Sequence, residues 1–145
     1  MTALHPVPPS AAQAYLSVNN IEVIYDHVIL VLKGVSLEVP RGKVVALMGA
    51  NGAGKSTTLN AISTLLRAER GDVTKGNISF NGERVDRLTP NELVRRGLSQ
   101  VMEGRHCFGH LTIEENLLTG AYTRRVPRAE LNRSLERVYH YFPRL

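Results

Sequence analysis

The sequence lacks the features that mark secreted, membrane-spanning and metal-binding proteins. Cys107 is the only cysteine among 145 residues, so no intrachain disulfide can form; we expect a reducing compartment and a packed, inert thiol. The longest apolar run, Val28 to Leu32, is far shorter than the roughly 20 residues that span a bilayer. Residues 1–15 lack the basic start and apolar centre of a secretory signal, and we expect a flexible leader there. The five histidines show no metal-ligand spacing.

Positive charge is in excess, but it is spread along the chain. Lys and Arg number 18 against 13 Asp and Glu, which gives a net charge of +5. A basic surface of this kind can bind nucleic acid or anionic lipid headgroups, or it can simply be exposed to solvent. The arginines are scattered from Arg67 to Arg144 without a long block or interleaved aromatic residues, which favours the solvated surface. Hydrophobic residues make up 43%, enough for the core of one modest domain.

One stretch carries specific chemistry: Gly49 to Thr57, with the sequence Gly-Ala-Asn-Gly-Ala-Gly-Lys-Ser-Thr. It has the spacing of a phosphate-binding loop, which is Gly, four residues, then Gly-Lys-Ser. Glycines let the backbone take positive φ and approach a polyphosphate closely, and successive N–H groups then form an anion-binding nest. Lys55 can reach the β- and γ-phosphates, and the Ser56 hydroxyl can bind Mg²⁺. The alternative is a glycine-rich turn that ends in Lys-Ser by chance.

The flanking segments favour the phosphate-binding loop. Val44 to Met48 is a short apolar run, typical of a strand that is buried on both faces. Residues 57–66 carry Leu59, Ile62 and Leu66 at helical spacing. Strand, loop and helix is the order that the motif requires, and the positive end of the helix dipole adds to the attraction for phosphate.

The rest of the chain shows further strand and helix patterns. Apolar alternation and turn signals predict strands at 16–24, 28–39, 77–80 and 98–102, with a hairpin turn at Asn81-Gly82. Residues 67–75 are polar and are expected to form a connection. Capping signals at Thr89 and Thr112, and an amphipathic pattern further on, predict helices at 89–96, 112–118 and 127–141.

Taken together, these segments resemble the ATP-binding subunit of ABC transporters over nearly the whole chain, from residue 16 to residue 145. The matching segments are Tyr25, 32–37, the phosphate-binding loop, 76–82 and 111–117, in order and at the family's spacing. The resemblance implies an α/β fold of the P-loop NTPase type, an ABC nucleotide-binding domain with an N-terminal antiparallel β-subdomain. It also implies that ATP and Mg²⁺ bind.

The resemblance assigns roles to single residues. Tyr25 would stack on adenine, the alternative being a tyrosine packed at a strand end. Glu103 would replace the family's glutamine that touches Mg²⁺ and the attacking water. A carboxylate suits a hard cation such as Mg²⁺. Gln100 is the nearest glutamine and is the other candidate for this role. The alternative interpretation of Glu103 is an acidic loop residue exposed to solvent. The phosphates would be held by the whole loop, namely Gly49, Ala50, Asn51, Gly52, Ala53, Gly54, Lys55, Ser56 and Thr57.

Two further segments resemble the branched-chain amino acid importer branch of the family. These segments are 103–108 and 142–145. Just before the first of them, Met102 stands where that branch has proline. Importers of urea or other amides share much of this pattern. The resemblance implies an ATPase on the cytoplasmic face of the cell membrane. Its implied partners are a second ATP-binding subunit, permease subunits and, indirectly, a periplasmic or extracellular substrate-binding protein, and no nucleic acid.

Several motifs of the family are absent from the sequence. There is no Leu-Ser-Gly-Gly-Gln signature, no second Walker motif with its catalytic Glu, and no switch His. We therefore expect residues 16–145 to form part of a nucleotide-binding domain with an incomplete core sheet and unpaired edges. We also expect the chain alone to bind nucleotide weakly and to hydrolyse it hardly at all. A binding module without turnover is the competing function, while a GTPase is disfavoured because Asn-Lys-x-Asp is absent.

Overall fold

The computed structural model describes residues 14–104, 106–123 and 126–145. The chain divides into two compact units, 1–90 and 91–145. Most of the predicted leader lies outside the described residues. Tyr15, at its end, is hydrogen-bonded at the edge of the first unit: its N–H donates to the Val39 carbonyl at 2.9 Å, and its carbonyl accepts from the Asn81 N–H at 2.7 Å.

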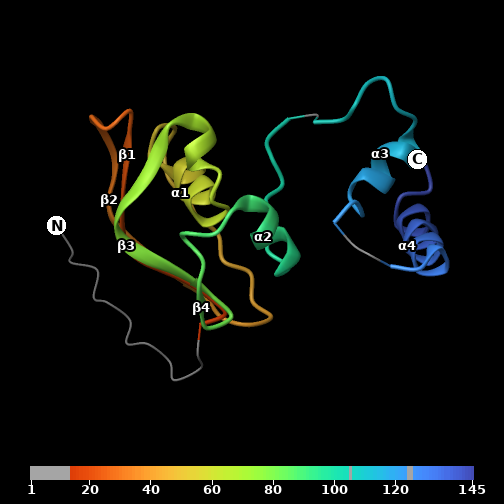
Figure 1. Ribbon diagram of the computed structural model, residues 1–145, viewed down its shortest axis with the longest axis horizontal. Coiled ribbons are helices and arrows are strands. Elements are labelled where there is room, and N and C mark those ends of the chain that lie inside the picture. The colour runs from red at the N-terminus through yellow and green to blue at the C-terminus, as the bar shows by residue number, and fades with distance from the viewer. Residues whose placement is uncertain (1–13, 105, 124–125) are drawn as a thin grey trace. The chain divides into compact units, whose positions relative to one another are not determined.

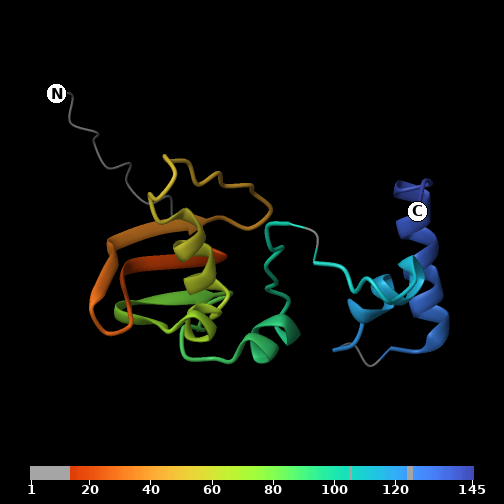
Figure 2. The same cartoon turned by 90° about the horizontal axis from the view of Figure 1, so that it is seen from above.

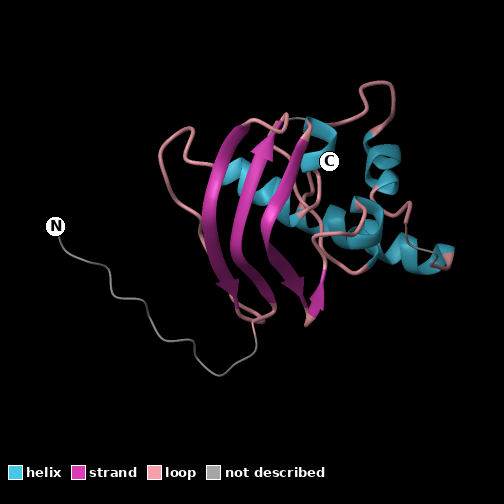
Figure 3. Cartoon of the chain, turned by 60° about the vertical axis from the view of Figure 1, so that its left-hand side comes forward, coloured by secondary structure: helices cyan, strands magenta, loops and turns pink. Residues whose placement is uncertain are grey.

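The first unit is built on a four-stranded sheet with the order β2-β1-β3-β4 and antiparallel pairing (Figure 3). Its strands are β1 (Leu16–Tyr25), β2 (Ile29–Val39), β3 (Gly71–Phe80) and β4 (Glu83–Arg84). The predictions for the first two strands and for the Asn81-Gly82 hairpin are confirmed. β1 and β3 are each paired on both sides, and β1 joins the two other long strands, β2 and β3.

One face of this sheet is covered by α1 (Lys55–Ile62) and the short 3₁₀ helix η1 (Leu66–Glu69), as Figures 1 and 2 show. A register shift between Val18 and Ile21 keeps both side chains on the buried face, although they are three residues apart. The core consists of apolar side chains from the strands and the two helices: Val18, Ile21, Val23, Leu32, Ala61, Ile62, Leu66, Ile78, Phe80 and Val85.

Two predicted core strands are wrong. Residues 44–48 and 98–102 form no strand. A parallel strand needs partners for its N–H and C=O groups, and no described segment pairs with either stretch. Their apolar side chains are correspondingly open to solvent, Val44 being 98% exposed and Val101 94%. The α/β character of the described residues therefore comes from the antiparallel sheet and its helices.

The segment after the loop helix also differs from the prediction. The helix that was expected to reach Leu66 ends at Ile62, and Thr64 then takes a positive φ of 59°. Residues 67–75 are not a simple polar connection, because η1 ends at Glu69 and β3 begins at Gly71. The second half of β3 confirms the strand predicted at 77–80. The first half was missed because it pairs with β1 while Asp72, Thr74 and Lys75 are exposed.

The remaining helices lie where the sequence predicts them. They are α2 (Pro90–Arg95), α3 (Ile113–Thr119) and α4 (Arg128–Tyr141). The capping box of α3 is confirmed, since the Thr112 Oγ1 accepts from the Glu115 N–H at 3.2 Å and the Glu115 carboxylate accepts from the Thr112 N–H at 2.7 Å. In the second unit α3 and α4 lie side by side (Figure 1). None of the helices among the described residues is long and apolar enough to cross a membrane.

Removing a side chain from the centre of the sheet should destabilise the first unit strongly. Ile78 on β3 is 0% exposed. We expect Ile78→Ala to lower the free energy of unfolding by about 2–5 kcal/mol, because it leaves a cavity in the core beside its β1 partner Val18. Urea unfolding followed by circular dichroism measures the change. Val28→Ala is the control, because Val28 is 82% exposed; equal effects of the two substitutions would contradict the assigned core.

Candidate phosphate-binding site

The predicted phosphate-binding loop leads directly into the N-terminus of α1. Gly52 and Gly54 take φ values of 81° and 86°, and Gly54 is the N-cap residue of the helix. These left-handed values cost glycine little and other residues about 1–2 kcal/mol. Between them the Ala53 N–H donates to the Ala50 carbonyl at 3.1 Å, which closes a tight turn. The glycines thus allow the curvature that a phosphate cradle needs.

The Lys55 ammonium lies against the inner side of this curved loop. Its Nζ donates to the carbonyl oxygens of Gly49 and Ala50, at 2.8 Å each. An ammonium has three N–H donors, so these two bonds leave one N–H for another acceptor. The loop therefore fixes a positive charge at the start of α1, with a donor still available.

The first turn of α1 presents groups that suit an anion. Ser56 is exposed, Thr57 is half-buried, and the turn contains no acidic residue. The first N–H groups of any helix have no acceptor within the helix, and the helix dipole makes that end positive. The Thr58 hydroxyl donates to the Gly54 carbonyl at 2.8 Å and so fixes the junction between loop and helix.

Tyr25, at the end of β1, contacts the same helix. Its hydroxyl donates to the Glu69 Oε2 at 3.4 Å. Partial burial raises the pKa of Tyr25; the nearby Thr57 hydroxyl opposes this rise, and the Glu69 carboxylate adds to it. The structure thus brings Tyr25 and the loop helix together, although they are far apart in the sequence. Their roles toward a nucleotide stay predictions.

Glu103 belongs to the second unit and is exposed. Its backbone carbonyl lies 2.6 Å from the His106 Nε2. Its role, and the choice between it and Gln100, stay predictions. Cys107, expected to be packed, is exposed, so that expectation is wrong. No group of three or more His, Cys, Asp and Glu side chains arranged for a metal ion occurs within the described part of the chain.

Sequence reasoning missed two residues of this region, Asn60 and Glu69. The Glu69 Oε2 accepts from the Asn60 Nδ2 at 3.1 Å as well as from Tyr25. Glu69 fell in a segment predicted to be a simple connection, and Asn60 looked like an ordinary polar helix residue. Only the tertiary arrangement brings them together.

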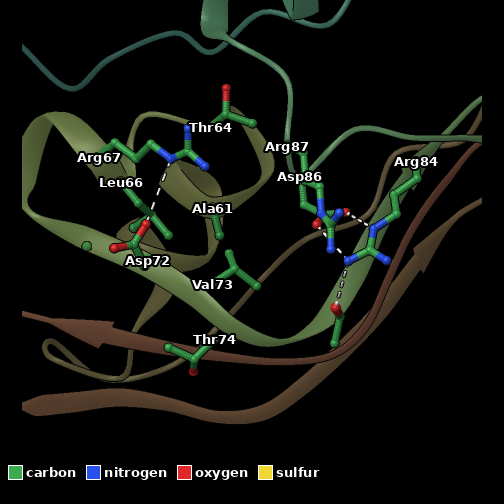
Figure 4. Close-up of a pocket in the computed structure, with 12 residues that line it drawn as sticks. Ala61, Thr64, Leu66, Arg67, Asp72, Val73, Thr74, Arg84, Asp86 and Arg87 are labelled. Carbon is green, nitrogen blue, oxygen red and sulfur yellow. Dashed lines mark hydrogen bonds and ion pairs between the residues drawn. The ribbon is translucent and has the colours of Figure 1, made fainter. Parts of the chain in front are cut away.

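A separate pocket of about 210 Å³ lies at the other end of α1, between that helix and β3 (Figure 4). Arg84 donates to both carboxylate oxygens of Asp86, at 2.8 and 2.9 Å, and the Ile78 N–H donates to Asp86 at 3.2 Å. Arg67 and Asp72 approach to 3.8 Å. Because these charges pair within the pocket, we assign it a structural role in joining β3 to the segment after β4.

Comparison with known proteins agrees with this geometry. The family model described as "ABC transporter" matches residues 32–144. Since that match covers most of the sequence, the chain belongs to the ABC transporter family. A solved structure, the ATP-binding subunit of an ABC transporter, superposes with a TM-score of 0.71 at 34% identity, covering 87% of this chain and 49% of that one.

Two curated relatives illustrate the range of the family. The chain is 35% identical over 130 residues to the high-affinity branched-chain amino acid transport ATP-binding protein BraG of Pseudomonas aeruginosa, covering 90% of this chain and 52% of BraG. It is 35% identical over 117 residues to the sn-glycerol-3-phosphate import ATP-binding protein UgpC of Brucella abortus, covering 81% of this chain and 31% of UgpC. The chain thus spans about half the length of the first relative and about a third of the second.

Adding a side chain at Gly54 should disturb the loop more than adding one at Gly52. Both substitutions force alanine into positive φ, at a cost of about 1–2 kcal/mol. A Cβ at Gly54 would also collide with the Leu32 side chain, whereas nothing lies within 4 Å of one at Gly52. We expect Gly54→Ala to lower thermal stability more than Gly52→Ala, as measured by differential scanning calorimetry. Equal shifts would contradict the observed loop geometry.

The Asp86 carboxylate should make stability depend on acid pH. Burial alone would raise its pKa, but hydrogen bonds from Arg84 and from the Ile78 N–H outweigh burial and hold the pKa below its ordinary value. This stabilisation is present above the unfolded-state pKa of about 3.9 and is lost as pH falls through the lower folded-state value.

We therefore expect the free energy of unfolding to fall more steeply in the wild type than in Asp86→Asn as pH decreases from about 5 to 2. Urea unfolding at a series of pH values measures both slopes. Glu38→Gln, which removes an exposed carboxylate of β2, is the matched control. Equal slopes in the wild type and in Asp86→Asn would contradict the assigned role.

Proposed function

We propose that this chain forms the nucleotide-binding part of the ATP-binding subunit of an ABC importer. One observation carries the proposal: the Lys55 ammonium is held by the loop carbonyls of Gly49 and Ala50 at the positive end of α1. Family membership supports ATP as the nucleotide, because the related proteins are described as ATP-binding subunits. Tyr25 is linked to the same helix through Glu69, which accepts from both Tyr25 and Asn60, and so offers an aromatic ring there.

In this proposal the triphosphate lies along the N-terminus of α1. The free N–H of Lys55 donates to the β- and γ-phosphates, and the free N–H groups of the loop and of the first turn of α1 face them. Ser56 would hold Mg²⁺, which would neutralise phosphate charge, and Thr57 would donate near the α-phosphate. Tyr25 stacks on the adenine through its π-face. By the resemblance alone, Glu103 would be the residue that touches Mg²⁺ and the attacking water.

We propose that ATP hydrolysis by these 145 residues alone is very slow. Phosphoryl transfer depends on positioning and on charge stabilisation by several groups at once. The sequence holds the phosphate-binding loop but neither the signature motif nor the second Walker motif. The alternative function is a nucleotide-binding module without turnover. Robust phosphate release that depends on Lys55 would exclude both very slow hydrolysis and a module without turnover.

For the transported substrate we propose branched-chain amino acids. The similarity to BraG over 90% of this chain supports this choice, together with the motifs at 103–108 and 142–145. UgpC, by contrast, is described as an sn-glycerol-3-phosphate import protein. The alternative proposal for this chain is an importer of urea or other amides. The proposed partners are a second ATP-binding subunit, permease subunits that hold the chain at the inner face of the membrane, and indirectly a substrate-binding protein.

The central test is equilibrium binding of Mg-ATP. We expect Lys55→Ala to lower the affinity by at least about tenfold, because a charge-assisted hydrogen bond contributes about 1.5–3 kcal/mol. Isothermal titration calorimetry on the full chain measures both affinities. Lys43→Ala removes an exposed lysine just before the loop and serves as the control. If Lys55→Ala binds Mg-ATP as tightly as Lys43→Ala does, the proposed site is wrong.

A further inference from the structure

The cross-strand partner of Tyr25 is a glycine. In the β1–β3 ladder Tyr25 stands directly opposite Gly71, which is buried although it has no side chain. A Cβ added at Gly71 would lie 2.9, 3.1 and 3.2 Å from the Cε1, Cδ1 and Cζ atoms of the Tyr25 ring. The ring therefore occupies the space that any larger residue at position 71 would fill. An aromatic ring laid over a cross-strand glycine packs closely and fixes the direction of the side chain.

The hydroxyl end of Tyr25 is fixed separately, through α1. Glu69 accepts from the Tyr25 hydroxyl at 3.4 Å and from the Asn60 Nδ2 at 3.1 Å, using the same oxygen, Oε2. Asn60 is only 7% exposed, so this link is anchored in the core. Thr57, whose nearby hydroxyl opposes the rise in the pKa of Tyr25, lies three residues before Asn60 and so on the same face of the helix.

These contacts define a Tyr25 cluster, made of Tyr25, Thr57, Asn60, Glu69 and Gly71. It ties a ring at the end of β1 to the helix that follows the phosphate-binding loop. Tyr25 is followed at once by Asp26 and His27, both with positive φ, so the chain turns directly after the ring. The orientation of the ring therefore depends on Gly71 beneath it and on Glu69 at its hydroxyl.

We propose that Glu69 and Gly71 are positioning residues that hold the Tyr25 ring ready for the nucleotide base. This inference rests on the proposed function, since it assumes that the base stacks on Tyr25. A ring held in one orientation gives up little freedom when a base stacks on it, so the base binds more tightly. The cluster acts on the base only, whereas Lys55 and the loop act on the phosphates.

The test compares two ligands, Mg-ATP and inorganic tripolyphosphate, by isothermal titration calorimetry on the full chain. Glu69→Ala and Tyr25→Phe should each weaken ATP binding about 2- to 10-fold, the range expected for one lost hydrogen bond. Tripolyphosphate binding should stay unchanged, because it has no base. The Tyr25→Phe/Glu69→Ala double variant should be no weaker than either single variant, because both remove the same interaction. Glu69→Gln, which keeps an acceptor, should restore most of the affinity.

Gly71→Ala tests the other contact. It should push the ring aside and weaken ATP binding by up to the roughly 5- to 150-fold expected for the loss of base–aromatic stacking. Gly109→Ala is the control for a glycine substitution, because nothing lies within 4 Å of the added Cβ, and Glu38→Gln is the control for the carboxylate. If Gly71→Ala fails to fold, the Glu69 and Tyr25 variants still decide the question.

Two results would overturn the inference. One is a loss of ATP and tripolyphosphate affinity by equal factors in Glu69→Ala, which indicates a structural role. The other is additive effects of Glu69→Ala and Tyr25→Phe. If Lys55→Ala weakens ATP binding while all cluster variants leave it unchanged, the inferred positioning role of the cluster is wrong and the proposed function stands. If the wild type binds neither ligand, the proposed function fails and this inference fails with it.

Discussion

The contact between the Lys55 ammonium and the loop carbonyls of Gly49 and Ala50 is the interaction on which the site depends. A cation bonded to two carbonyls closes the loop without any ligand and keeps positive charge at the start of α1. The left-handed conformations of Gly52 and Gly54 make this closure possible. The buried side of α1, with Thr58, Asn60, Ala61 and Ile62, packs on the sheet, so the same helix fixes the loop to the core.

The register of the antiparallel sheet adds a second element to this site. Pairing of β1 with β3 places Tyr25 opposite Gly71, and η1 immediately before β3 supplies Glu69. Residues from three separate parts of the chain thus meet at one face of α1. A shift of the β1–β3 register by one residue would turn Tyr25 to the opposite face of the sheet. The sheet therefore positions the aromatic side chain, while the loop positions the charge.

Sequence reasoning found the local features and missed those that depend on distant partners. The loop, β1, β2 and the Thr112 capping box follow from residue type and spacing within a few positions, and they were predicted. Residues 44–48 and 98–102 carry the apolar pattern of strands, but a strand exists only when its backbone is paired, and no described segment pairs with them. Glu69 could not be found because its partners, Tyr25 and Asn60, are defined only by tertiary packing.

The central claim is that the loop at the start of α1 binds nucleotide phosphates through its backbone N–H groups. Amide chemical shifts in ¹⁵N-labelled chain, recorded during titration with Mg-ATP, test this directly. We expect saturable shifts centred on the amides of Gly52, Gly54 and Lys55. Unchanged loop amides, with shifts instead around the arginine-lined pocket at the other end of α1, would contradict it.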